Sequence, residues 1–68
     1  MHDETLNLSI RKFLKFVGVN SQREIEQAVA HALESRRIAG DERFPALMKL
    51  EVPGLSLSVK FDGEIRLE

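Results

Sequence analysis

The sequence predicts an α+β fold in which two helices pack on one face of a three-stranded antiparallel meander, in the order α-α-β-β-β. We expect one domain over residues 1–68. Three observations predict this fold. Apolar residues recur at spacings of three and four up to Arg36, a glycine followed by a capping motif interrupts them at residues 18–24, and the apolar spacing changes to two after Pro45.

The first helix is expected to run from about Asp3 or Thr5 to Val17. Asp3 and Glu4 place negative charge at its N-terminus, where it opposes the helix dipole. Gly18 is expected to end this helix in the left-handed conformation, followed by the hydrophobic Val19. The face predicted to be buried comprises Leu6, Ile10, Phe13, Leu14 and Val17.

A second helix is predicted to begin at the capping box Ser21-Gln22-Arg23-Glu24. In such a box the serine hydroxyl accepts a hydrogen bond from the N–H of the glutamate, whose carboxylate accepts one from the N–H of the serine. Ile38-Ala39-Gly40 is expected to close this helix. Its apolar stripe comprises Ile25, Ala28, Val29, Ala32, Leu33 and the stem of Arg36.

Three strands are predicted in the C-terminal part, where apolar residues alternate with polar ones. A two-residue loop at Pro53-Gly54 would pair Val52 with Leu55, although a wider loop of the same parity also fits. A three-residue loop, Phe61-Asp62-Gly63, would form the second hairpin as a G1 bulge, with positive φ at Gly63. The strand between these two loops would lie in the middle of the sheet.

Composition argues against several classes of function. The chain has no cysteine, which excludes disulfides and Cys-based metal sites, and its net charge is −1 with both signs interspersed. A mixed surface of this kind is unlike the basic patches that bind nucleic acids. No apolar run approaches membrane-spanning length. We expect a cytoplasmic protein with no membrane association, no cofactor and no metal.

Three apolar residues fall outside the predicted core faces and are candidate protein contacts: Leu8, Phe16 and Leu47. The simpler interpretation of Leu8 is an exposed leucine, or a helix that starts late with Ser9 as its cap. The leading hypothesis is a small non-enzymatic module that binds an unidentified protein, or itself as a homodimer, through this surface or an edge strand.

The alternative hypothesis is nucleic-acid binding through a helix-turn-helix-like pair. The segment from Leu14 to Gln22 is similar to the glycine turn of DNA-binding repressors, and the candidate base-reading residues are Gln22, Arg23 and Gln27. Two features count against it. Glu24 stands where a buried aliphatic residue is usual, and strands rather than a third helix follow the pair.

A catalytic role is the least supported. His31 lies in a predicted helix with Glu34 three residues on, but no second strong ligand lies four residues away. The carboxylates of Asp41 and Glu42 lie in a loop without an apolar pocket. The four glycines are isolated, so no phosphate-binding loop is predicted. We therefore expect no catalytic residues.

Several short motifs resemble a family of short bacterial proteins known as a domain of unknown function. The resemblance covers most of the chain and implies a bacterial, cytosolic, stand-alone domain, but it brings no active site with it. The motifs are Ser9-Ile10-Arg11-Lys12-Phe13-Leu14, Gly18-Val19, Ser21-Gln22-Arg23-Glu24-Ile25-Glu26, Gly54-Leu55 and Asp62-Gly63-Glu64-Ile65.

Overall fold

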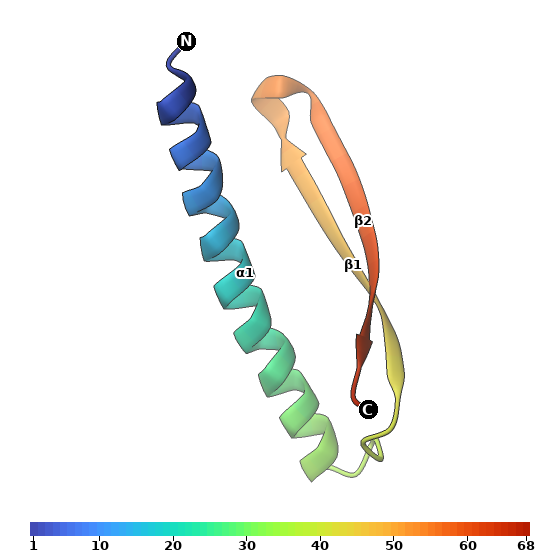
Figure 1. The fold of residues 1–68 in the computed structure, drawn as a ribbon. Coiled ribbons are helices and arrows are strands. Elements are labelled where there is room, and N and C mark those ends of the chain that lie inside the picture. The colour runs from blue at the N-terminus through green and yellow to red at the C-terminus, as the bar shows by residue number, and fades with distance from the viewer. The chain divides into compact units, whose positions relative to one another are not determined.

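The computed structural model describes all residues, 1–68, and divides into two compact units, residues 1–35 and residues 36–68. The first unit holds one helix, α1 (Asp3–Glu34). The second holds an antiparallel hairpin of β1 (Arg43–Val52) and β2 (Leu57–Arg66), joined through the 3₁₀ turn η1 (Pro53–Leu55) (Figure 1). The prediction of two helices and a three-stranded meander is therefore wrong: the chain has one long helix and two strands.

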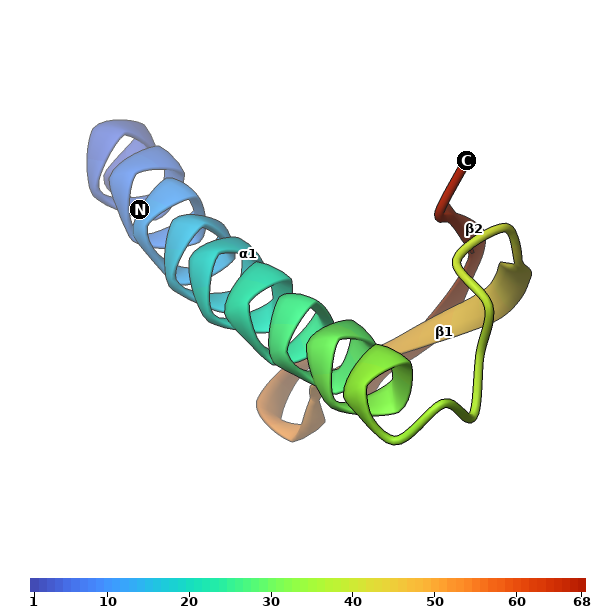
Figure 2. The same cartoon turned by 90° about the horizontal axis from the view of Figure 1, so that it is seen from below.

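The predicted break at Gly18 does not exist. Gly18 lies in the middle of the 32-residue α1 and has no positive φ. Figure 2 shows α1 as one continuous helix. The capping box is also absent, because Ser21 and Glu24 lie inside the helix. A helix end leaves four N–H or four C=O groups without helical partners, whereas one interior glycine costs about 1 kcal/mol relative to alanine. Continuing the helix through Gly18 therefore has the lower free energy.

The ends of α1 also differ in part from the prediction. Its N-terminus begins at Asp3, as expected, with Asp3 and Glu4 in the first turn. Its C-terminus lies at Glu34, several residues before the expected Ile38-Ala39-Gly40 stop. The backbone turns into the left-handed region at Arg36, which has a φ of 59°. Arg36 thus occupies the position where many helices place a glycine.

A carboxylate organises the segment that leads from α1 into β1. Glu42 Oε2 accepts a hydrogen bond from the Ala39 N–H at 2.7 Å, and Oε1 accepts one from the Gly40 N–H at 2.9 Å. These two backbone donors, Ala39 first, lower the pKa of Glu42 below its ordinary value. The ionised side chain therefore holds the turn around Gly40, whose φ is 108°.

The observed hairpin keeps the predicted side-chain parity but shifts the pairing by two residues. Val52 pairs with Leu57 rather than with Leu55, because η1 makes the loop wider than two residues. Ser56 completes the loop in the left-handed conformation, with φ 52° and ψ 35°. A shift of two leaves each side chain on its predicted face.

The second predicted turn, at Asp62-Gly63, is likewise absent. Both residues lie inside β2, where Asp62 pairs with Leu47 and Gly63 pairs with Ala46. Gly63 has no positive φ, so the predicted G1 bulge is wrong. Extending β2 to Arg66 pairs every residue of β1, and a main-chain bond from the Leu67 N–H to the Glu42 C=O continues the ladder at 3.1 Å.

Pro45 is accommodated inside β1 by the hydrogen-bond pattern. Antiparallel ladders alternate hydrogen-bonded and non-hydrogen-bonded pairs. The bond between Leu67 and Glu42 makes that pair hydrogen-bonded, so the Pro45–Glu64 pair is of the other kind. A backbone nitrogen in such a pair faces outward from the hairpin. The N–H that proline lacks would therefore have pointed away from β2.

Neither unit encloses a core. No residue of the chain is fully buried. A single helix and a two-stranded hairpin each have too few layers to enclose a side chain, and neither element type is ordinarily stable alone in water. The apolar faces of both units are consequently the features most in need of a partner surface.

Candidate functional site

The hairpin has one face that is continuously apolar. Five successive cross-strand pairs contribute it, and none of their ten residues is charged or polar. At its centre Met48 is 46% exposed and its partner Phe61 is 56% exposed. The pairs are Phe44–Ile65, Ala46–Gly63, Met48–Phe61, Leu50–Val59 and Val52–Leu57. We call these ten residues the apolar hairpin face.

The opposite face of the hairpin is polar and electrically mixed. Lys49 lies directly across from Lys60, and the Lys49 Nζ lies 3.4 Å from Glu51 Oε1 on the same strand. Both partners of that ion pair are about half exposed, so its net contribution to stability is small. The face as a whole combines charges of both signs and does not form a single-sign patch that would suit a polyanion.

An apolar stripe runs along the whole of α1. Its members recur at spacings of three and four on both sides of Gly18, and Ser21 is the one polar member, between Val17 and Ile25. The two predicted apolar faces do not coincide fully with it, because Phe13 lies beside its N-terminal half and Val29 and Leu33 lie along the opposite border of its C-terminal half. The large members are well exposed, for example Leu14 at 54%. The stripe comprises Leu6, Ile10, Leu14, Val17, Ser21, Ile25, Ala28 and Ala32, and we call these residues the helix stripe.

The three candidate protein contacts are all exposed. Leu8 and Phe16 lie on α1, outside the helix stripe and on the side away from it, and are 63% and 66% exposed. Leu47 lies on the polar face of the hairpin, opposite Asp62, and is 60% exposed. The contact role of these residues stays a prediction. The sequence interpretation placed Phe61 and Ile65 on the apolar side, but it put Gly63 in a turn between them and so missed that one strand carries all three on one continuous face.

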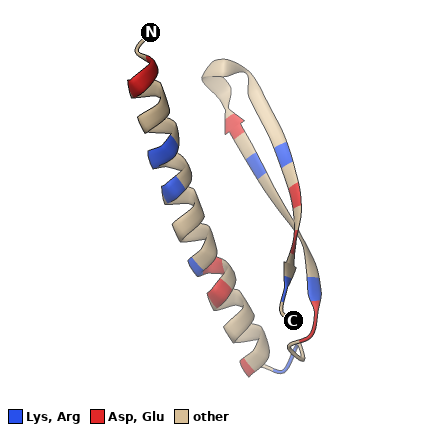
Figure 3. Cartoon of the chain, viewed as in Figure 1, with Lys and Arg blue, Asp and Glu red and all other residues tan.

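The helix-turn-helix interpretation loses its geometric basis. Gln22, Arg23 and Gln27 lie in the middle of α1, and no turn separates them from the preceding residues. A recognition helix uses residues near its own N-terminus, which these are not. Charges along α1 are segmented instead, with basic residues between Arg11 and Arg23 and acidic residues at its start and toward its C-terminus (Figure 3).

His31 and Glu34 do not form a site with other groups. The His31 C=O accepts hydrogen bonds from the Ser35 N–H and hydroxyl, which belong to the helix end. No group of three or more His, Cys, Asp or Glu side chains lies close enough to hold a metal ion.

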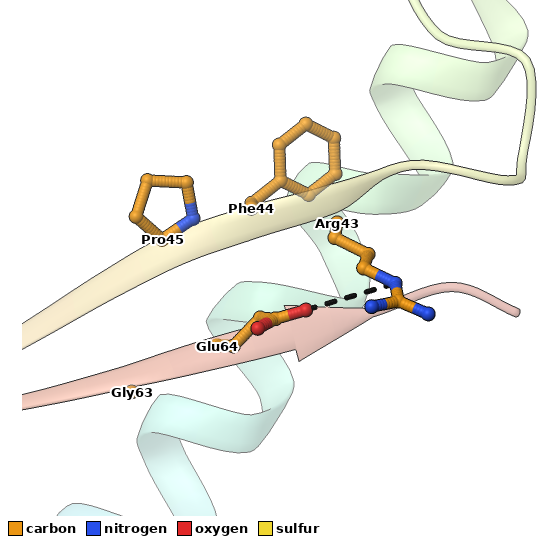
Figure 4. Close-up of a pocket in the computed structure, with 5 residues that line it drawn as sticks. All are labelled: Arg43, Phe44, Pro45, Gly63 and Glu64. Atoms are coloured by element: carbon orange, nitrogen blue, oxygen red, sulfur yellow. Dashed lines mark ion pairs between the residues drawn. The ribbon is translucent and has the colours of Figure 1, made fainter.

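A hollow at the open end of the hairpin is lined by Arg43, Phe44, Pro45, Gly63 and Glu64 (Figure 4). Its two charged groups form an ion pair, with Arg43 Nε 3.8 Å from Glu64 Oε1. Both side chains remain about half exposed or more, so water screens this pair. The lining offers no nucleophile and no second carboxylate, and we assign no chemistry to it.

Together these features define a class of protein: a short chain in which one amphipathic helix precedes one amphipathic hairpin. The chain belongs to a family of unknown function, DUF6494, whose model matches residues 1–68. The resemblance to a family of unknown function is thereby confirmed. No curated protein and no solved structure matches the chain.

The structure also bears on membrane insertion. The helix α1 does not combine the length and the apolar character that a bilayer-crossing helix requires.

Proposed function

We propose that this chain is a small non-enzymatic protein-interaction module. The observation that carries the proposal is the apolar hairpin face, because five consecutive cross-strand pairs without a polar side chain are unusual on a solvated two-stranded sheet. An antiparallel sheet normally turns such a face toward another packed layer. The second unit contains no layer of its own that could cover it.

The chemistry of this face suits a protein surface. Protein interfaces are depleted of charge at their centre and enriched in aromatic residues and methionine, and Met48, Phe61 and Phe44 supply those side chains here. The charged side chains of the hairpin lie on the opposite face, so none interrupts the apolar one. The face offers no cluster of donors that would bind a phosphate or a sugar.

The test compares two variants of equal chemistry on opposite faces of the hairpin. Phe61→Lys places a charge on the apolar hairpin face, and Leu47→Lys places the same charge on the polar face at nearly the same exposure, 60% against 56%. Tagged chains would be used to recover partners from a lysate of the native cell, with and without nuclease, and mass spectrometry would compare the recovered proteins.

We expect Phe61→Lys to lose the recovered proteins and Leu47→Lys to keep them, in both the presence and absence of nuclease. Far-ultraviolet circular dichroism would check that both variants remain folded. If Phe61→Lys unfolds, the nearly isosteric Met48→Gln replaces it. Equal recovery by all variants, or recovery that disappears with nuclease, would contradict the proposal.

A further inference from the structure

The helix stripe of α1 is asymmetric in side-chain size. Its N-terminal half carries large aliphatic residues, among them Leu6, Ile10 and Leu14, whereas its C-terminal half contains the small residues Ala28 and Ala32. A flat apolar surface would pack poorly on such a gradient, because protein interiors are filled to nearly crystalline density. The gradient therefore predicts a partner surface whose own gradient runs the opposite way.

A reversed copy of α1 has the required surface. When two helices run antiparallel with residue numbers that sum to 38 at each level, Leu6 meets Ala32, Ile10 meets Ala28, and Val17 meets Ser21. The two other stripe members, Leu14 and Ile25, come level with Glu24 and Phe13, which border the stripe. Each contact occurs twice about a two-fold axis, as an isologous interface demands. A parallel pair would instead place large residues against large ones in one half and leave a gap in the other.

We propose that the helix stripe pairs with the same stripe of a second copy of this chain, antiparallel, about an axis level with Val19. This inference rests on the proposed function, because it names the partner for one surface of the interaction module. The axis lies at the middle of α1, so nearly the whole of both helices overlaps.

The length of the elements favours a helix over the hairpin as the occupant. Thirty-two helical residues span about 48 Å at 1.5 Å per residue. A ten-residue strand spans about 33 Å, so a hairpin of this length covers roughly two thirds of the helix stripe. A second α1 is the element of matching length.

Charge also favours the antiparallel orientation. The basic segment Arg11–Lys15 of one copy comes level with the segment of the other copy that contains Glu24 and Glu26. A parallel pair would set like charges level with each other. The preference is modest, since exposed charges are screened over about 8 Å at physiological salt. Two conflicts remain, because Lys15 comes level with Arg23 and Glu4 comes level with Glu34.

Disulfide trapping tests the pairing directly, because the natural chain has no cysteine to interfere. Purified full-length Ile10→Cys and Ala28→Cys would be mixed under mild oxidation. We expect a covalent dimer between the two variants and little dimer from either alone, since each residue faces the other position and not itself. Light scattering of the wild-type chain is expected to give a molar mass twice that of one chain.

A matched control uses Leu8→Cys mixed with Ala30→Cys. These positions also sum to 38 and are therefore level, but they lie on the side of α1 away from the helix stripe, so we expect no covalent dimer. If Ile10→Cys loses helicity, Val17→Cys and Ser21→Cys form a second pair. Cysteine differs from serine only in its sulfur atom, so Ser21→Cys changes the side chain very little.

Three results would overturn the inference. Self-linking of Ile10→Cys without its partner would mean a parallel pair, and linking of the control pair at an equal rate would mean another face. A mass of one chain, with no linking of either stripe pair, would mean no dimer. In that last case the Phe61→Lys comparison still decides the proposed function, because it measures recovery of other proteins through the hairpin.

Discussion

At the scale of single residues, Glu42 has the best-defined electrostatic role in the chain. Its carboxylate accepts the Ala39 and Gly40 N–H groups, and these bonds favour the ionised form and lower the pKa. A lowered pKa in the folded state means that the carboxylate stabilises the turn above its ordinary pKa. That contribution disappears as the pH falls through the lowered value.

We therefore predict an acid-sensitive turn between α1 and β1. The amide proton shifts of Ala39 and Gly40, followed by NMR, should titrate with a midpoint below the ordinary glutamate pKa of about 4.3. The same titration should be lost in Glu42→Gln, which keeps the size of the side chain and removes its charge. A midpoint at or above the ordinary value in the natural chain would contradict this role.

At the scale of elements, the periodicity of the side chains predicts where helices and strands end better than the positions of the glycines do. The four-residue spacing from Val17 to Ser21 to Ile25 is that of an unbroken helix, although Ser21 is polar, and the side-chain alternation continues from Phe61 through Gly63 to Ile65. Each glycine was interpreted as a turn although the pattern on both sides was in register. The helical and extended regions and the hairpin parity were predictable, but the number of elements was not.

The physical reason lies in the cost of ending an element. A second helix must be nucleated separately, and its presence leaves backbone N–H and C=O groups without helical partners at two more helix ends. The free-energy cost of both exceeds the small loss of helix propensity at one interior glycine. The candidate surfaces were likewise predictable only in part. The outward position of Leu47 was predicted correctly, whereas the full apolar hairpin face could not be predicted once β2 had been cut at Asp62.

Gly18→Ala tests the continuous helix. An added Cβ at Gly18 meets no atom within 4 Å, so the change should raise the free energy of unfolding of α1 by about 0.5–1 kcal/mol. Thermal unfolding followed by circular dichroism at 222 nm would measure it. A left-handed Gly18 between two helices would give the opposite sign, so a destabilised variant would contradict the single helix.

At the scale of the whole molecule, the chain divides its apolar surface between two thin units that each lack a second layer. A small chain of this design obtains much of its stability from what covers those surfaces. Association and folding are then linked, because a partner that binds only the folded form raises its apparent stability by mass action. The surfaces of the proposed interaction module therefore also stabilise the fold.

Pro45 carries a consequence for how far such association can extend. Both strands of a two-stranded hairpin are edges, and repeated edge-to-edge pairing would build an open ribbon of indefinite length. The outward position of β1 that would donate a hydrogen bond to the next hairpin is occupied at residue 45 by a ring with no hydrogen. Growth along that edge is interrupted at this point.

Pro45→Val should remove the interruption. Valine favours the strand conformation and restores the outward N–H at residue 45. It leaves residue 45 paired with Glu64. We expect the variant to form thioflavin-binding fibrils under conditions where the natural chain and a Leu47→Val control do not. Equal behaviour of all three chains would show that the edge is closed by other means. Fibrils from Pro45→Val alone would instead show that the hydrogen missing from the Pro45 nitrogen separates a finite assembly from a polymer.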